Sequence, residues 1–217
     1  MTTQHVETLI IGAGQAGLAT AYQLQRLGHD SLIVDEAARI GDNWRRHYDS
    51  LTLFTPAYAN SLDGLPYPGE PWHFPTKDEF AEYLELYAVA NSLPVRMQTR
   101  VERLADRDGG FVAAIGPDEI TCDNVVVATG TFGRDPVVPA LARELDARIH
   151  QIHSSEYRNP EQLEPGGVLV GAGSSQKLHY IEPDERVNPR TAEILETLAP
   201  GAAHPVVTVT GRQAARS

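Results

Sequence analysis

The hydrophobic and polar positions of the first 35 residues predict one strand, one helix and a second strand. Residues 6–11, Val-Glu-Thr-Leu-Ile-Ile, form a mostly apolar run of the kind found in buried strands. A second apolar run at 32–34 ends in Asp35. Between the two runs, before Gly28 ends the pattern, apolar side chains recur at helical spacing, at Leu18, Ala21, Tyr22, Leu24 and Leu27. This order of elements predicts a β-α-β unit.

A second helix is predicted over residues 77–90. Thr76 and Glu79 have the spacing of a capping box, in which the two residues satisfy each other's backbone amides at the start of a helix. Apolar side chains follow at helical spacing, at Phe80, Tyr83, Leu84 and Tyr87. The pattern stops between Asn91 and Pro94, and we interpret this helix as scaffold.

The following residues read as strands. Runs at 95–97, 101–104 and 111–115, separated by a turn at 108–110, predict a small antiparallel β-meander. The continuous apolar run that ends in Ala128-Thr129-Gly130 predicts a buried parallel strand, whose carboxyl end faces the crevice where such sheets bind ligands.

Residues 51–75 are rich in proline, glycine and aromatic side chains and show no period. A stretch of this length without regular structure often covers a functional site. It is equally well interpreted as an ordered excursion whose aromatic residues form a small core of their own.

Composition narrows the possible functions. The 217 residues include 41% hydrophobic and 22% charged side chains, which predicts a packed core. A net charge of −11 argues against nucleic acid or an anionic membrane surface as a partner. No apolar run approaches a membrane span and Met1–His5 lacks the basic region of a signal peptide, so we expect a cytoplasmic protein. Cys122 is the only cysteine, which excludes an internal disulfide, a C-x-x-C redox pair and a cysteine-based metal site.

The candidate chemistry begins between the first strand and the first helix. Gly12-Ala13-Gly14-Gln15-Ala16-Gly17 matches G-x-G-x-x-G, with the strand before it and the helix after it that dinucleotide binding requires. The first glycine allows the tight turn, the second lets a pyrophosphate approach the backbone, and the third lets the helix pack on the strand. Asp35 follows at the distance of the acid that binds a ribose 2′-hydroxyl. The motif predicts a bound dinucleotide and leaves FAD and NAD open.

Together with this motif, Gly41-Asp42-Asn43-Trp44-Arg45, Ala128-Thr129-Gly130 and His153-Ser154-Ser155-Glu156-Tyr157 make the chain resemble the flavin-dependent monooxygenases, over residues 5 to about 175. The resemblance implies an enzyme in which NADPH reduces FAD and a flavin peroxide oxygenates a small organic substrate. It implies a Rossmann-like FAD-binding α/β domain at 1–165, with a parallel sheet and the small meander. The implied FAD-binding residues are Gly12, Gly14, Gln15, Ala16, Gly17, Asp35, Glu36, Trp44, Arg45, Val101, Thr129 and Gly130.

The chain also departs from that family. A fingerprint before the NADPH motif keeps His153 and Tyr157, but Ala147 and Ile149 replace its Phe and Gly. Phe54 stands where relatives that oxidise nitrogen and sulfur tend to place an asparagine. The family's catalytic chemistry belongs to the cofactor, and no catalytic side chain is assigned.

A second, incomplete Rossmann unit is predicted at 166–177. Its strand and turn imply NADPH-binding residues at Gly171, Gly173, Ser174 and Ser175. Gln176 replaces the third glycine, and Pro183 and Pro189 interrupt the helix that should follow. We therefore expect NADPH to bind poorly.

Residues 178–217 show no likeness to the family, although 191–198 could form a helix, 206–210 a strand and 211–217 a frayed end. We expect a truncated or frame-disrupted product, or a fragment of a longer chain. Three interpretations remain open: an FAD-dependent monooxygenase, an FAD-binding module without catalysis, and an NAD-binding regulatory domain that uses the first motif alone.

Overall fold

The computed structural model describes residues 3–107, 109–130, 138, 140–166, 168–172, 177–181 and 206–210. The chain divides into two compact units, 1–133 and 134–217. The domain limits drawn from the sequence stay predictions, because this division does not say which residues bind a cofactor. Within the described residues no helix has the length and apolarity to cross a membrane.

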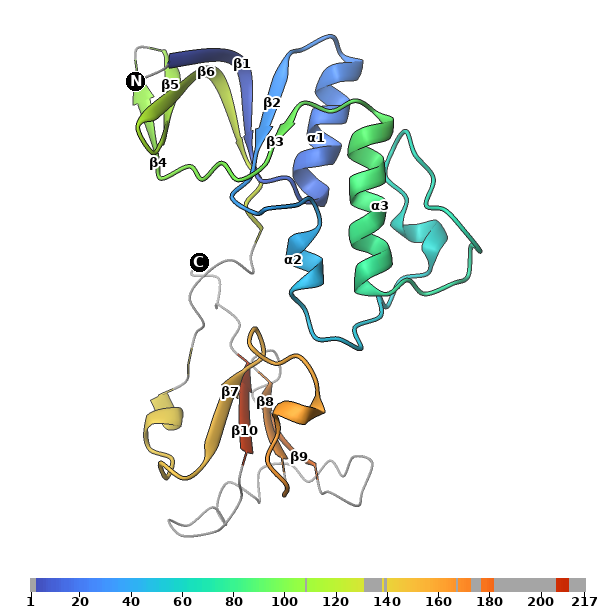
Figure 1. Ribbon diagram of the computed structural model, residues 1–217, viewed down its shortest axis with the longest axis vertical. Coiled ribbons are helices and arrows are strands. Elements are labelled where there is room, and N and C mark those ends of the chain that lie inside the picture. The colour runs from blue at the N-terminus through green and yellow to red at the C-terminus, as the bar shows by residue number, and fades with distance from the viewer. Residues whose placement is uncertain are drawn as a thin grey trace. The chain divides into compact units, whose positions relative to one another are not determined.

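The first unit is built on a six-stranded mixed sheet with the order β3-β2-β1-β6-β5-β4 (Figure 1). Its parallel part contains β1 (Thr3–Ile11), β2 (Ser31–Val34), β3 (Val95–Arg96) and β6 (Asp118–Val127). Its antiparallel part joins β4 (Arg103–Arg107) and β5 (Gly110–Ile115) to β6. The Rossmann-like α/β fold predicted from the sequence is confirmed.

One strand differs from the sequence prediction. Residues 95–96 do not join the meander but pair in parallel with β2 at the edge of the sheet, where Ile33 faces Val95 and Val34 faces Arg96. The meander consists of β4, β5 and β6, and β6 also pairs in parallel with β1. The apolar pattern predicted strands here correctly, but a pattern does not identify a strand's partner.

Three helices accompany the sheet: α1 (Gln15–Arg26), the short α2 (Asp42–Arg45) and α3 (Lys77–Ala90). In Figure 1, α1 and α3 lie side by side next to the parallel strands. Consecutive β1 residues are buried on opposite faces of the sheet. Ile10 packs with the side chains of α1 and α3, and Leu9 packs with the meander. This two-sided burial explains the apolar runs of β1 and β2. The prediction that the apolar run at the end of β6 is buried is wrong: Val125 and Val126 are half-buried and Val127 is 63% exposed.

Residues 51–75 form the ordered excursion that the sequence allowed. The two limbs of the segment are joined by backbone hydrogen bonds, from Leu53 N–H to Pro75 O (2.7 Å) and from Ala57 N–H to His73 O (2.7 Å). Tyr83 and Tyr87 of α3 donate their hydroxyls to backbone oxygens of the segment. The expected small core of the segment's own aromatic side chains is not formed: Tyr67 packs against the main core, and four others stay exposed, at Phe54, Tyr58, Trp72 and Phe74.

The capping box at the start of α3 is confirmed. Thr76 Oγ1 accepts from Glu79 N–H at 3.3 Å, and Glu79 Oε2 accepts from Thr76 N–H at 2.7 Å. The hydrogen bond from the Thr76 amide, followed by one with His73, lowers the pKa of the Glu79 carboxyl. The folded state therefore favours the carboxylate.

This geometry predicts a pH-dependent stability. A carboxyl whose pKa is lowered on folding stabilises the protein above its unfolded pKa and loses that contribution as the pH falls through the folded value. We expect the difference in unfolding free energy between wild type and Glu79→Gln to shrink towards acid pH, measured by urea denaturation. Glu70→Gln, at an exposed position, is the control. Thr76→Ala should cost about 1 kcal/mol at neutral pH. A Glu79→Gln difference that is constant with pH would contradict the assignment.

The second unit contains a four-stranded sheet in the order β7-β10-β8-β9. Strands β7 (His150–His153), β10 (Val206–Thr210) and β8 (Val168–Ala172) are parallel, and β9 (Lys177–Ile181) runs antiparallel to β8. The predicted strands at 168–170 and 206–210 are confirmed. Short 3₁₀ turns lie at Ala140–Arg143 and Pro160–Gln162, and another lies in the first unit at Ala57–Asn60. The predicted helix at 191–198 and the frayed end at 211–217 lie outside the described residues.

Candidate functional site: the glycine turn and its surroundings

The turn between β1 and α1 is tightly packed on both sides of one open position. A Cβ added at Gly12, where φ is +116°, would lie 2.3 Å from Ala128 O, and one added at Gly17 would lie 1.9 Å from Gly12 O. A Cβ at Gly14 would meet no atom within 4 Å. Gly12 and Gly17 are therefore required by the fold. Gly14 leaves open space in front of the backbone.

The start of α1 faces this open space with its amide groups. Gly14 is the N-cap residue, no side chain caps the helix, and its first turn contains no acidic residue. Gln15 and Ala16 are exposed there. The N-terminus of a helix carries roughly half a positive charge and unpaired N–H groups, and such a terminus binds phosphate. The geometry of the turn therefore fits an anionic ligand.

Asp35 joins the glycine turn to the segment that follows β2. Its Oδ2 accepts from Ala13 N–H at 2.6 Å, and its Oδ1 accepts from Ala37 N–H at 2.8 Å. A carboxylate has about four acceptor positions, so it can still accept hydrogen bonds from a ribose. The contact between Ala13 and Asp35 was not predicted from the sequence, because no side chain marks a backbone amide as a partner.

We predict that Asp35 stabilises the chain without any ligand. Asp35→Ala leaves the amides of Ala13 and Ala37 without their acceptors, which should lower the unfolding free energy by about 2 kcal/mol. Urea denaturation of the cofactor-free chain measures this. Asp30→Ala, which removes an exposed carboxylate at the other end of β2, is the control and should cost much less. Equal stability of Asp35→Ala and wild type would refute the prediction.

Thr129 and Gly130 are placed beside the turn by β6. Ala128 N–H donates to Ile11 O at 2.8 Å, and the backbone at 128–129 lies against Gly12. Gly130 has a φ of +71°. The structure thus brings together the glycine motif, Asp35 and the end of β6, three parts of the predicted FAD site.

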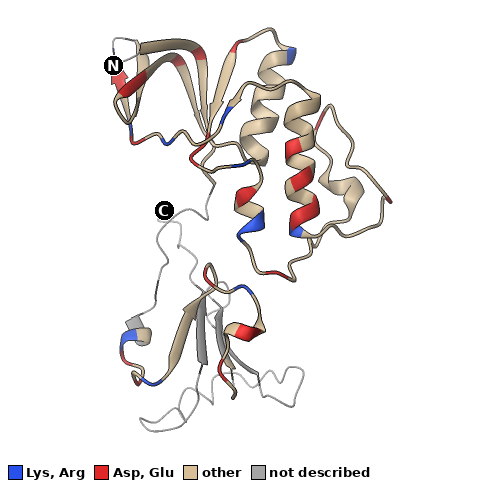
Figure 2. Ribbon diagram, in the orientation of Figure 1, with Lys and Arg blue, Asp and Glu red and all other residues tan. Residues whose placement is uncertain are grey.

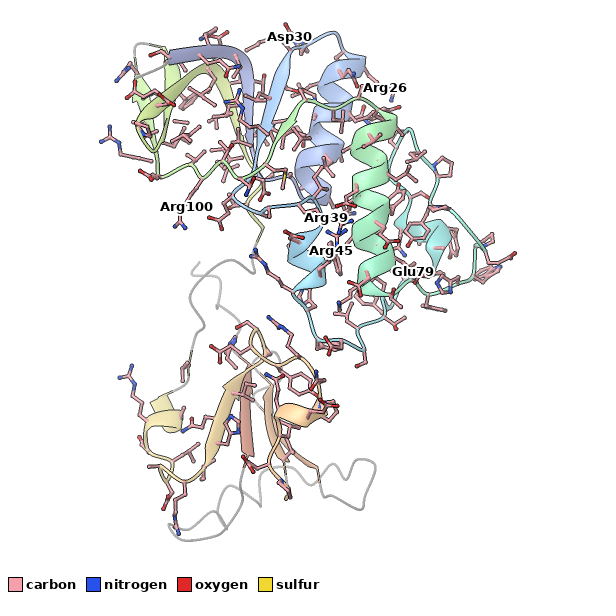
Figure 3. The ribbon with its side chains drawn as sticks, viewed as in Figure 1. Arg26, Asp30, Arg39, Arg45, Glu79 and Arg100 are labelled. Atoms are coloured by element: carbon pink, nitrogen blue, oxygen red, sulfur yellow. The ribbon has the colours of Figure 1, made fainter. Side chains whose placement is uncertain are left out.

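The other predicted FAD residues lie in the same unit but are engaged with protein neighbours. Glu36 is exposed and pairs with Arg100 at 3.3 Å, and Figure 3 shows Arg100 extending away from the fold. Val101 packs against the meander core. Trp44 stands edge-on to Phe80 of α3, with ring centroids 4.9 Å apart. Their contacts with a cofactor stay predictions.

Arg45 is directed at α3. Its Nη1 donates to Ile40 O at 2.6 Å, and its Nη2 lies 3.3 Å from Glu85 Oε1. The Nη2 atom is buried and makes no hydrogen bond, because the pair with Glu85 has the distance of an ion pair without hydrogen-bond geometry. Its role at the flavin is untested. Sequence reasoning missed Glu85, since the partners are 40 positions apart in the sequence and no pattern signals their contact.

The predicted NADPH site lies mostly outside the described residues. Gly171 is in β8, whereas Gly173, Ser174 and Ser175 are not described. The residues after the turn, Lys177–Ile181, form strand β9, where a complete motif would continue as a helix. His153 of the fingerprint ends β7, and its Nδ1 lies 2.8 Å from Ser155 Oγ.

A groove lies between α3 and the 51–75 segment. It is lined by aromatic, apolar and acidic side chains, among them Tyr67, His73, Glu79, Glu82, Tyr83 and Leu86. Desolvation, followed by the charges of Glu79 and Glu82, raises the pKa of Tyr67 to about 12. None of the predicted FAD-binding residues lines this groove.

The strand, glycine turn, helix and acid define the Rossmann-like fold of the dinucleotide-binding flavoproteins. Comparison with known proteins agrees: residues 9–177 match the family described as pyridine nucleotide-disulphide oxidoreductase. The chain belongs to this family. The cysteine pair of a dithiol reductase is nevertheless absent from the sequence, and burial raises the pKa of the Cys122 thiol and so keeps it unreactive.

Individual relatives support the resemblance to flavin-dependent monooxygenases. The chain is 46% identical to an uncharacterized oxidoreductase CzcO-like of Geobacillus kaustophilus, over 84% of this chain and 53% of the relative. It is 34% identical to the indole-3-pyruvate monooxygenase YUCCA1 of Oryza sativa, over 77% of this chain and 42% of the relative. A mutant flavin monooxygenase of Stenotrophomonas maltophilia superimposes with a TM-score of 0.71 at 30% identity, over 80% of this chain and 53% of that chain.

These relatives confirm the prediction of the flavin-dependent monooxygenase family and of an oxidoreductase by resemblance. The chain spans about half the length of the curated relatives it matches. The activity and the substrate are therefore proposed below.

Proposed function

We propose that this chain binds FAD and forms the FAD-binding part of an NADPH-dependent monooxygenase that oxygenates a small organic substrate. The observation that carries the proposal is the open space at Gly14 between the closed positions Gly12 and Gly17. This space lies at the uncapped start of α1 and beside Asp35. Relatives whose names include flavin monooxygenase or indole-3-pyruvate monooxygenase support FAD over NAD.

The residues present fit FAD in charge and in space. The pyrophosphate would lie against the Gly14 backbone and the amides of Gln15, Ala16 and Gly17, where no acidic side chain of α1 opposes it. The Asp35 carboxylate, held by Ala13 and Ala37, would accept hydrogen bonds from the ribose hydroxyls. Thr129 and Gly130 at the end of β6 would close over the cofactor.

Bound FAD would supply the redox and oxygen chemistry of such an enzyme. The protein's part is to bind and orient the cofactor and to exclude water. Asp35 would bind the ribose and at the same time fixes the glycine turn through the amide of Ala13. The 36–46 segment follows Asp35 and packs on α3 through Trp44. No side chain of the described residues is assigned a proton-transfer role.

A spectrum of the purified full chain before and after addition of FAD tests the proposal. Retained flavin, visible as flavin absorbance after gel filtration, is the expected result. A chain that binds NAD and takes up no FAD would instead favour the regulatory interpretation. Colourless protein with no affinity for either nucleotide would overturn dinucleotide binding altogether.

A second candidate function is an FAD-binding module that does not catalyse. The strand β9 in place of a motif helix favours it, because a helix N-terminus is the usual phosphate site of an NADPH-binding turn. Anaerobic addition of NADPH to the flavin-loaded chain separates the two. Bleaching of the flavin supports the enzyme, and a weak or absent response supports the module.

A further inference from the structure

One face of α3 holds the segment that follows Asp35. Lys77, Ala81 and Glu85 are spaced four residues apart and so share a face of the helix. Each of the three contacts residues between 39 and 46. Figure 3 shows Arg39 and Arg45 in the space between α2 and α3.

Lys77 and Ala81 of α3 are in close contact with α2 and its first residues. The buried Lys77 directs its Nζ to Arg45 O at 3.3 Å. Gly41, with a φ of +82°, begins α2, and a Cβ there would lie 2.8 Å from Ala81 Cα. The start of α2 is therefore pressed against α3.

Glu85 holds two arginines of the segment at once. Arg39 Nη2 donates to Glu85 Oε2 at 2.8 Å, and Arg39 Nε pairs with Oε1. Arg45 Nη2 lies 3.3 Å from the same Oε1. The side chains of Arg45 and Glu85 are 20% and 25% exposed, so water screens this pair less than it screens the pair with the more exposed Arg39. Hydrogen bonding to Glu85 raises the pKa of Arg39.

The segment is thus held at both ends. Near its start, Asp35 accepts from the amide of Ala37 and Glu85 binds Arg39; near its end, Glu85 also pairs with Arg45. The buried Nη2 of Arg45 offers no accessible surface to a ligand. The contacts of Arg45 with Ile40 O and Glu85 instead fix the backbone around Trp44.

We propose that Glu85 is a positioning residue for the FAD site and that its pairs with Arg39 and Arg45 keep the 36–46 segment in a cofactor-binding conformation. This inference rests on the proposed function. Glu85 itself touches no cofactor. Its effect is transmitted through the segment between Asp35 and Arg45.

We call the contacts of Glu85 with Arg39 and Arg45 the clamp on the 36–46 segment. Tryptophan fluorescence of the full chain tests the clamp without any cofactor. The sequence contains two tryptophans, Trp44 and the exposed Trp72, so Trp72→Phe makes Trp44 the single reporter. In this background, Glu85→Gln should increase the quenching of Trp44 by acrylamide. Glu82→Gln is the matched control: Glu82 is exposed on the same helix, and no hydrogen bond of the described residues joins it to the 36–46 segment. The control also removes one charge near Arg39, so it separates net charge from direct bonding.

Titration of the same variants with FAD tests the functional part. Glu85→Gln should weaken FAD binding about tenfold, with Glu82→Gln close to the parent. Should Glu85→Gln fail to fold, Arg39→Gln removes the more exposed partner and should act in the same direction.

Greater quenching together with weaker FAD binding, in Glu85→Gln alone, supports the proposal. Unchanged Trp44 quenching overturns the clamp, and increased quenching with unchanged FAD affinity overturns its role in the cofactor site. A parent chain that binds no FAD counts against the proposed function. In that case the cofactor role of Glu85 falls with it, while the Trp44 measurement still decides the clamp.

Discussion

Replacement of Gly14 by valine is expected to abolish flavin retention and to leave the fold intact. Gly14 has a φ of −81°, which any residue adopts, and a side chain there would meet no protein atom within 4 Å. The added methyl groups would occupy the space in which the pyrophosphate approaches the backbone. Flavin absorbance after gel filtration measures retention, and thermal unfolding of the cofactor-free variant measures the fold.

Ala90→Val provides a control for added bulk, since Ala90 is an exposed residue at the end of α3. It should change neither flavin content nor stability. Gly14→Ala should fall between wild type and Gly14→Val. Normal flavin content in Gly14→Val, in a correctly folded chain, would refute the site.

The second large effect is expected from Gly17→Ala, and it is a loss of stability. The new Cβ would lie 1.9 Å from Gly12 O and 3.1 Å from Gly12 C, both backbone atoms that cannot rotate away. Either α1 moves off β1 or the turn opens, at an expected cost of about 3 kcal/mol or more. Urea denaturation of the cofactor-free chain measures the loss.

Gly17→Ala and Gly14→Val together separate folding from binding within one motif. The first should lower the unfolding free energy with no cofactor present, and the second should not. A Gly17→Ala chain as stable as wild type would show that the helix and strand are packed less closely than the structure has them. Loss of stability in Gly14→Val would mean that its open space is needed by the fold.

The glycine turn is connected to α3 through Asp35 and the 36–46 segment. The glycine turn, Asp35 and the 36–46 segment form a connected series: Ala13 donates to Asp35, Ala37 donates to Asp35, and Arg45 near the end of the segment pairs with Glu85. Figure 2 shows acidic residues along α3 and an arginine at the end of α2, and of these acidic residues Glu85 is the one that pairs with Arg45. We expect variants at either end of the series to affect flavin binding more than exposed acids elsewhere do.

Much of the first unit could be predicted from local patterns. The strand at 6–11, the helix after Gly17 and the strand ending at Asp35 follow from apolar periodicity, because burial on one or both faces requires those spacings. The capping box at Thr76 and Glu79 was predictable since both partners lie within one helical turn. The motif also predicted open space at Gly14, and a Cβ there would meet no atom within 4 Å.

Tertiary structure alone decided the partners that lie far apart in the chain. It placed Val95–Arg96 beside β2 and not in the meander, because alternation of apolar residues shows that a strand exists and not what it pairs with. It also turned Arg45 towards Glu85 and gave Asp35 the amide of Ala13 as a donor. The sequence by itself determined most of the elements and the glycine turn between β1 and α1, since these depend on neighbours within a few residues. The clamp on the 36–46 segment arises only when folding brings α3 against α2, and no local signal encodes that contact.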